Sequence, residues 1–463
     1  MGYRIGFIST RFNGADGVTL EAGKWAEVLE KSGNTCFWFA GELDKSVERS
    51  FLVPEAHFKD EHNQWVNDRV FDQTRRSPAV TERIHATRSF LKSRLHAFID
   101  KFKIDILVAE NALTIPMQIP LGLALSETLA ETGLPAIAHH HDFYWERIRY
   151  TVNAVGDYLQ AAFPPQQPNL HHVVINSDQQ KQLALRSGIT ATVIPNVLDF
   201  AHPPKVDKGR GQLFRKAMGL TSEDKIILQP TRVIRRKGIE HAVELVRALA
   251  DPCYKLVVTH EAGDEGYAYA EWLASHARDN GVDLRLATMD LEDPWADPES
   301  VHKTTENDFT LWDMYDQADL VTYPSLYEGF GNAFLEAVYL RKPILINRYE
   351  TFIRDIEPLG FQLATMDGFL SKSTVQHVKT ILASPELSAG MTTHNYTVAA
   401  DNFSYGVLEE RLGYVMRNAT GNAGYGKYRP ETSQHNVVYL DGSTGFQAHP
   451  FDSRRHQRSL STM

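Results

Sequence analysis

Short apolar runs that alternate with helical segments constrain the fold of this chain more than any other feature. The first run covers residues 3–9, and a turn-forming stretch follows it. Leu20, Trp25 and Leu29 then recur at helical spacing before a second apolar run at 35–40. A strand, a helix and a strand at this spacing form a βαβ unit, whose strands are parallel and buried on both faces. The chain is therefore expected to be an α/β protein with helix-covered parallel sheets.

The same alternation continues in two series, so we expect two Rossmann-like parallel-sheet domains. A proline pair and a charged stretch near residue 203 separate the series and suggest a linker. From about residue 420 the chain is rich in Gly, Ser, Asn, Gln and His without periodicity, which favours a flexible tail. The predicted boundaries are 1–202 for the first domain, 203–402 for the second, 403–418 for a final helix, and 419–463 for the tail.

Charge and cysteine content exclude several classes of protein. The 463 residues include 48 basic and 58 acidic side chains, and the net charge of −10 argues against a general nucleic-acid binder. Two cysteines cannot build a disulfide framework or a cysteine-based zinc site. We find no apolar run long enough for a signal peptide or a transmembrane helix. A cytoplasmic location is expected, and the oligomeric state is not indicated.

A glycine-containing segment at residues 327–337 carries the strongest functional signal. It follows an apolar run and precedes a helical pattern, and two glycines there expose backbone N–H groups at a helix start, where anions such as diphosphate bind. Glu328 and Glu336 flank this turn, and carboxylates accept hydrogen bonds from hydroxyl groups. A phosphate joined to a sugar, such as a nucleotide sugar, suits both features. A glycine turn with a surface glutamate is the alternative.

Two cations follow the first predicted strand of the second series. Arg232 and Lys237 stand in its loop, and loops at the carboxyl ends of parallel strands bind ligands in such folds. Cations there can neutralise a diphosphate leaving group without a metal. The alternative is a solvated surface loop.

Three adjacent histidines, His139, His140 and His141, end another predicted strand and precede Asp142. Successive strand side chains point to opposite faces, so at most two of these rings can converge. We find no carboxylate or histidine partner at recognisable metal-ligand spacing, and no metal is expected. A buried, purely structural histidine is the alternative to a functional one.

These motifs together resemble the retaining glycosyltransferases of family 4, which have the GT-B fold. The resemblance covers residues 3–417. It rests on the spacing from Glu328 to Glu336, on the Gly-Phe-Gly between them, and on Arg232 with Lys237. Further matching pieces are the glycine loop at 14–18, residues 194–199, the pair at 141–142, and the helix after residue 403, which in the family crosses back to the first domain.

The resemblance implies transfer of a hexose, glucose or mannose, from a nucleoside diphosphate sugar to an acceptor hydroxyl with retention of anomeric configuration. UDP-glucose and GDP-mannose are the leading donors, and no metal or other cofactor is expected. A sugar-nucleotide epimerase and a phosphorylase-like enzyme share the two-domain layout and remain alternatives. The implied catalytic residues are His141, with His139 as the second choice, and Arg232, Lys237 and Glu328. The implied donor-binding residues are Gly17, Phe330, Gly331, Asn332 and Glu336.

Three arginines suggest the chemistry of the acceptor. Arg11 lies in the first predicted loop, and Arg147 and Arg149 follow the histidine run. Guanidinium groups that converge there would suit an acceptor with a carboxylate or phosphate group. Alternatively, they pair with Asp16, Asp142 or Glu146 and serve only the structure. Two segments depart from the family pattern: residues 259–263, which replace a glycine-rich turn, and the long acidic stretch at 289–308, whose role is not assigned.

Overall fold

The computed structural model describes residues 2–14, 16–260, 267–286 and 310–421. Part of the atypical 259–263 segment, the acidic 289–308 stretch and nearly all of the predicted tail lie outside these residues. Within the described ranges, no helix combines the length and the apolar character needed to cross a membrane.

The first domain contains a seven-stranded parallel sheet with the order β3-β2-β1-β4-β5-β6-β7. Chain order reverses between β1 and β4, as in a doubly wound Rossmann sheet. Its strands are β1 (Arg4–Ile8), β2 (Thr35–Ala40), β3 (Ser50–Leu52), β4 (Ile106–Glu110), β5 (Ala136–His140), β6 (Leu170–Val174) and β7 (Ala191–Val193). Its helices are α1 (Gly17–Lys31), α2 (Glu61–Asn67), α3 (Pro78–Phe102), α4 (Ile119–Thr132), α5 (Gly156–Ala162) and α6 (Ser177–Ser187).

The second domain contains a six-stranded parallel sheet with the order β10-β9-β8-β11-β12-β13, whose order reverses between β8 and β11. Its strands are β8 (Lys225–Arg232), β9 (Tyr254–His260), β10 (Leu284–Leu286), β11 (Leu320–Tyr323), β12 (Ile344–Asn347) and β13 (Ala364–Met366). Its helices are α7 (Lys208–Ala217), α8 (Ile239–Leu249), α9 (Ala268–Asp279), α10 (Leu311–Gln317), α11 (Asn332–Tyr339), α12 (Lys372–Ala383) and α13 (Pro385–Asn402). The prediction of two parallel-sheet domains is confirmed.

Strand alternation divides the core of the first domain into two layers. Ile8 and Leu107 contact α3 and α4 on one face, whereas Ile5, Phe7 and Ile106 contact α1 on the other. Every residue of β4 is buried, as expected for a strand covered on both faces.

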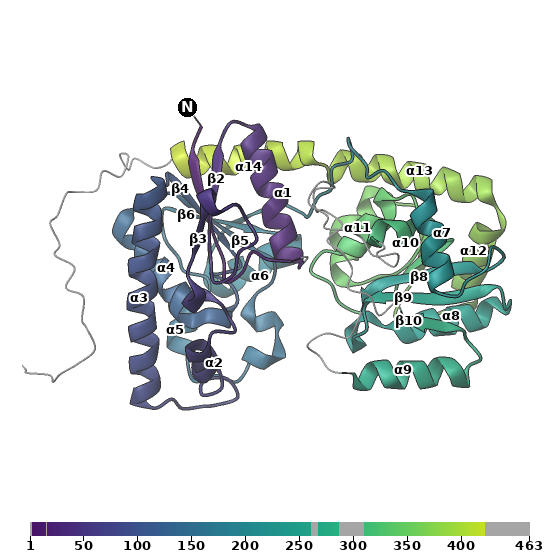
Figure 1. The fold of residues 1–463 in the computed structure, drawn as a ribbon, viewed down its shortest axis with the longest axis horizontal. Helices are drawn as coiled ribbons and strands as arrows, with labels where there is room; N and C mark the ends of the chain where they lie inside the picture. Colours follow the sequence, from purple (N-terminus) through teal and green to yellow (C-terminus); the bar gives the residue numbers. More distant parts are fainter. Residues whose placement is uncertain (1, 15, 261–266, 287–309, 422–463) are drawn as a thin grey trace, which may run out of the picture. The chain divides into compact units, whose positions relative to one another are not determined.

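The last described helix, α14 (Tyr405–Gly421), packs on the first domain beside α1 (Figure 1). Its Leu408, Leu412 and Val415 belong to the same cluster as Ile5. The helix extends to Gly421 rather than ending at residue 418, because Ala419 is still buried against the domain.

Candidate active site

The predicted site residues lie at the carboxyl ends of strands beside the two chain-order reversals. In the first domain these are the loop after β1, which leads to Gly17, and the end of β5, with His141. In the second domain they are the loop after β8, with Lys237, and the loop after β11, with Glu328. Such crevices at a reversal of strand order are where open α/β sheets bind ligands.

Backbone geometry at the start of α11 requires glycine. Gly331 has a φ of +123°, and a Cβ atom there would lie 2.3 Å from the Tyr349 hydroxyl oxygen. That hydroxyl group donates a hydrogen bond of 2.7 Å to the carbonyl oxygen of Phe330, whose side chain is buried. The turn is therefore held rigidly, with the first residue of α11, Asn332, directly after it.

Lys237 and Glu328 form a buried ion pair that joins the two loops of the second domain. Arg236 also contacts the carboxylate, with its Nη1 atom 3.3 Å from Glu328 Oε2. Burial alone would raise the pKa of Glu328, but the charges of Lys237 and Arg236 lower it, so the carboxylate is ionised. Arg232 is exposed at the end of β8, and its charge contributes to the lowered pKa of Lys237, which burial lowers most.

Glu336 occupies the middle of α11 and is half-buried. The Tyr315 hydroxyl donates a hydrogen bond of 2.9 Å to its Oε2 atom. Burial raises the pKa of Glu336, although this hydrogen bond lowers it in part. A carboxylate with one oxygen engaged by tyrosine keeps acceptor capacity for ligand hydroxyl groups.

Residues of the first domain contact the start of α11. Asn196 Nδ2 donates a hydrogen bond of 2.6 Å to Asn332 Oδ1. A Cβ atom on Gly17 would lie 3.6 Å from Asn332 Nδ2, so α1 and α11 begin close to each other. Gly17 and Asn332, which the sequence assigned together to the donor, are therefore neighbours.

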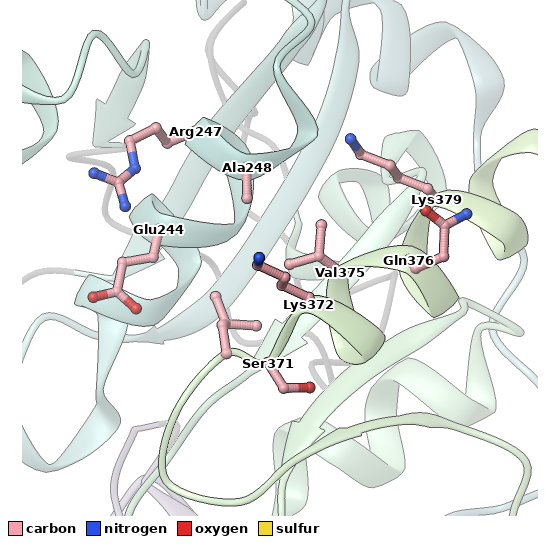
Figure 2. Close-up of a pocket in the computed structure, with 9 residues that line it drawn as sticks. Glu244, Arg247, Ala248, Ser371, Lys372, Val375, Gln376 and Lys379 are labelled. Atoms are coloured by element: carbon pink, nitrogen blue, oxygen red, sulfur yellow. The ribbon is translucent and has the colours of Figure 1, made fainter.

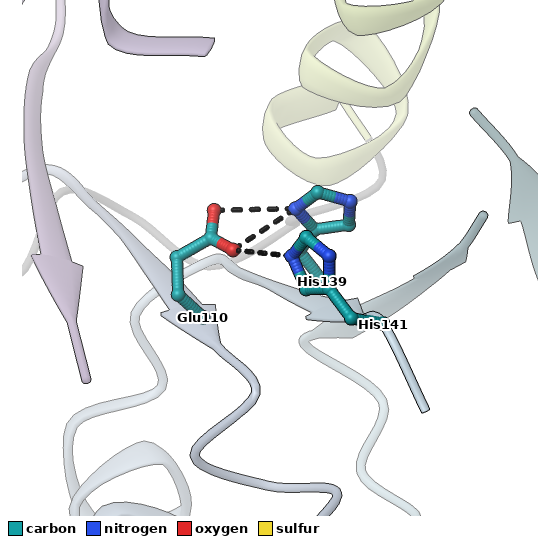
Figure 3. A group of neighbouring side chains, drawn as sticks. All are labelled: Glu110, His139 and His141. Atoms are coloured by element: carbon teal, nitrogen blue, oxygen red, sulfur yellow. Dashed lines mark hydrogen bonds and ion pairs between the residues drawn. The ribbon is translucent and has the colours of Figure 1, made fainter. Parts of the chain in front are cut away.

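The histidine run divides between the two faces of its strand. His139 Nδ1 lies 3.0 Å from Glu110 Oε2, and His141 Nε2 lies 3.2 Å from the same oxygen (Figure 3). His140 instead contacts the Thr114 hydroxyl and His172. The sequence patterns did not single out Glu110 as a site residue. The feature that could have identified it is a carboxylate at the end of an otherwise apolar strand.

Glu110, His139 and His141 also form the group in the described part of the chain whose ligand atoms are close enough to hold a metal ion, all within 4.8 Å of one another. A histidine that binds a metal usually donates its other ring N–H group to a partner. His139 Nε2 is buried and has no hydrogen-bond partner. The contacts therefore fit a hydrogen-bonded cluster better than a metal site, and independence from metal stays a prediction.

The three arginines have different environments. Arg11 Nη2 lies 3.0 Å from Asp16 Oδ2, and Arg147 forms an ion pair with Asp142. Arg149 is exposed, with its guanidinium carbon 4.7 Å from the centre of the Tyr150 ring. Arg11 and Arg147 thus have carboxylate partners, as expected from the alternative in which these arginines serve only the structure. Both arginines remain partly exposed, with donors available to a ligand.

A separate hollow of about 400 Å³ lies between α8 and the beginning of α12. Figure 2 shows Glu244 and Arg247 on one side and Lys372 and Lys379 on the other. None of the predicted site residues lines it. Its mixed charges and exposed side chains do not indicate a particular ligand.

Known proteins with similar sequences span most of the chain. A family model described as glycosyl transferases group 1 matches residues 298–397. The mannosylglucosylglycerate synthase of Petrotoga mobilis is 30% identical over 387 residues, which cover 78% of this chain and 86% of that protein. The enzyme of the same name from Thermotoga maritima is 29% identical over 440 residues, covering 88% and 98%.

Solved structures agree in fold. A glycosyltransferase from Rickettsia africae has a TM-score of 0.63 at 13% identity and covers 90% of this chain and 98% of its own. The sucrose-phosphate synthase of Thermosynechococcus elongatus has a TM-score of 0.61 at 14% identity, with the same coverage of both chains. The chain therefore belongs to the glycosyl transferases group 1 and is a glycosyltransferase of the GT-B fold.

Proposed function

We propose that this protein transfers a hexosyl group, mannosyl in the first instance, from a nucleoside diphosphate sugar to an anionic acceptor of the glucosylglycerate type, with retention of anomeric configuration. The relatives from Petrotoga and Thermotoga support this choice, because both are mannosylglucosylglycerate synthases. These relatives do not favour the epimerase and phosphorylase-like alternatives.

The observation that carries the proposal is the group of cations at the β8–β11 reversal. Lys237 is held by Glu328 in the loop after β8, and Arg232 is the exposed last residue of the same strand. A diphosphate placed there would meet two cations, and the N–H groups at the start of α11 would add to them. Glu336 would accept hydrogen bonds from the ribose hydroxyls, and Glu328 from the sugar hydroxyls.

In the proposed reaction, the bond from the anomeric carbon to the phosphate oxygen breaks while the acceptor oxygen attacks from the same face. The acceptor proton passes to the leaving phosphate oxygen, so no protein nucleophile is needed. Lys237 and Arg232 stabilise the negative charge that develops on the diphosphate. His141 would contact the donor sugar and help to position it.

A thermal-shift screen of UDP, GDP and ADP, each alone and with its sugar attached, tests the donor. A ligand that binds the folded state raises the melting temperature by mass action. We expect GDP and GDP-mannose to give the largest shifts. If none of the nucleotides raised the melting temperature, the proposal would fail at donor binding, its first step.

The acceptor is tested by comparing glucosylglycerate, glycerate, a sugar phosphate and a neutral disaccharide. We expect transfer to the acceptors that carry a carboxylate or phosphate. Arg11→Ala, Arg147→Ala or Arg149→Ala should raise KM for the anionic acceptor by about tenfold, as expected when a charge-assisted hydrogen bond is lost.

Arg69→Ala provides the matched control, because Arg69 packs over Trp65 on α2, outside the proposed site. It should leave KM unchanged. A clear preference for the neutral disaccharide that persists in all three arginine variants would refute an anionic acceptor while leaving hexosyl transfer in place.

A further inference from the structure

A buried carboxylate lies behind the predicted catalytic histidine. Glu110 ends β4 and is fully buried, and the parallel register of β4 and β5 places it beside His139. Its carboxylate faces both the His139 and the His141 ring (Figure 3). Burying an ionised carboxylate costs several kcal/mol unless an opposite charge compensates it.

The neighbouring charges are already compensated. Asp142 forms an ion pair with Arg147, and Glu21 on α1 forms one with Lys24. Among the residues that the structure describes, the side chains in contact with the Glu110 carboxylate are the two imidazole rings. Burial would raise the pKa of Glu110, but these rings lower it to about 2, which means that the carboxylate is ionised and accepts hydrogen bonds from the rings.

The two rings differ in what they can reach. His139 is 1% exposed and stacks on Trp25 with 4.0 Å between ring centres. The His141 side chain is 10% exposed, and its Nε2 atom is the one that contacts Glu110. Its Nδ1 atom is thus the nitrogen left for another partner, and His141 is the ring that can contact a ligand.

Two observations place His141 beside the donor loop. Its carbonyl oxygen would lie 3.4 Å from a Cβ atom on Gly329, the residue after Glu328. Its backbone is held by Asn111, which accepts from the His141 N–H group at 3.0 Å, and by Gln179, which donates to the carbonyl oxygen at 2.9 Å. The backbone contacts fix the strand end, and Glu110 alone among the described side chains holds the ring by a hydrogen bond.

We propose that Glu110 is the positioning residue for His141, holding the ring protonated at both nitrogens so that Nδ1–H donates a hydrogen bond to the bound sugar nucleotide. This inference rests on the proposed function. The pKa of His141 supports it: burial lowers this pKa, but Glu110, with smaller contributions from Glu21 and Asp142, raises it overall. The doubly protonated ring is therefore favoured below that raised pKa and is lost as pH rises through it.

Glu110→Gln keeps the shape of the side chain and removes its charge. We expect kcat to fall by about 10- to 100-fold, because the ring loses the contact that positions it and small misplacements of a functional group are costly. KM for the donor should change little, and the basic limb of the pH–rate profile should move to lower pH. Glu110→Asp should restore part of the activity and of the original pH profile.

Glu127→Gln is the matched control, because Glu127 on α4 pairs with Arg88 and Lys92 on the surface. It should leave both kcat and the pH profile unchanged. Glu110→Gln combined with His141→Ala should be no slower than His141→Ala alone, since Glu110 acts through that ring.

Several results would overturn the proposal. One is an unchanged pH profile in Glu110→Gln, and another is a double variant in which the two losses multiply. A stoichiometric metal in the purified protein that is lost in Glu110→Gln would assign the cluster to a metal instead. If Glu110→Gln does not fold, His141→Gln is the second test, because it leaves the contact between Glu110 and His139 in place. This variant should lose the basic limb of the pH–rate profile. A basic limb that persists in His141→Gln would refute the proposal. Absence of transfer by the unaltered protein would instead refute the proposed function itself.

Discussion

At the scale of single residues, Lys237 and Glu328 depend on each other. Each is 8% exposed, so removing one partner leaves the other charge buried without its main compensation. The pairing also restricts both side chains, which holds a cation and a carboxylate beside each other where the β8 and β11 loops meet. Side chains that are already held in position need little rearrangement when charge develops on the substrate in the transition state.

Replacement of the two predicted diphosphate-binding cations tests this view. Lys237→Ala and Arg232→Ala should each lower kcat by about 100-fold or more, because the leaving diphosphate loses a cation that stabilises its developing charge. Arg235→Ala is the control from the same loop, since Arg235 lies over the Tyr269 ring. Steady-state turnover is the measurement, and near-normal rates in both variants would show that the diphosphate binds elsewhere.

The two glutamates of the donor loop should have separable roles. Glu336→Gln is expected to weaken nucleotide binding by about tenfold while leaving kcat nearly unchanged, because it removes a charged acceptor for the ribose hydroxyls. Glu328→Gln should mainly slow transfer, because it also releases Lys237. Titration calorimetry with the nucleoside diphosphate and single-turnover rates separate the two effects. Identical behaviour of the two variants would contradict the assignment.

At the scale of elements, β5 shows how one strand serves two purposes. His139 and His141 face Glu110, whereas His140 lies on the other face, where its Nε2 atom is 2.9 Å from His172 Nδ1 on β6. Burial lowers the pKa of His140 well below its ordinary value and lowers that of His172 to about 4. Both rings are therefore neutral in the folded protein at pH 7.

Because His140 and His172 are buried in their neutral forms, we expect the free energy of unfolding to decrease in acid. A histidine whose pKa is lowered on folding contributes stability above its ordinary pKa of about 6.5, and this stability is lost as pH falls toward the folded value. For His172 the loss develops between pH 6.5 and about 4 and amounts to about 3 kcal/mol. Denaturant unfolding at several pH values should show it. His172→Asn should reduce the loss, whereas His202→Asn, at an exposed position, should not.

At the scale of the whole molecule, the residues proposed to act on the donor come from both sheets. Asn176 Nδ2 donates a hydrogen bond of 2.6 Å to the carbonyl oxygen of Gly329, and the Tyr327 hydroxyl donates one of 2.9 Å to Glu146. These contacts join loops of the first domain to the loop that contains Glu328. Loops of both sheets therefore meet at the loop that contains Glu328.

This arrangement bears on the requirement for metal. Since we propose that cations of the chain, Lys237 and Arg232, neutralise the diphosphate in place of a divalent ion, we expect full activity after treatment with EDTA. The control is the same protein supplied with excess Mg²⁺, which should be no faster. A complete loss of activity that added metal restores would instead indicate an essential metal ion, bound by the cluster of Glu110, His139 and His141 or by the acidic segment at 289–308.

The sequence by itself determined the features that depend on neighbours along the chain. Alternating strands and helices predict two parallel sheets, because parallel strands need a long crossover connection, which is usually a helix. The glycines before a helical pattern predict the turn at Gly331 that begins α11, where we propose that the diphosphate binds. The spacing from Glu328 to Glu336 places Glu328 in the turn before α11 and Glu336 in the helix itself. The strand period also predicts correctly that no more than two of the three histidine rings share a face.

Only the tertiary structure decided which distant side chains meet. Glu110 faces His139 because β4 and β5 are adjacent and in a particular register, and no local pattern reveals that register for strands buried on both faces. Lys237 reaches Glu328, 91 residues away, because β8 and β11 are neighbours at the reversal of strand order. Local sequence predicts the elements and their turns, whereas ion pairs between loops follow from strand order and register, which the packing of the whole chain determines.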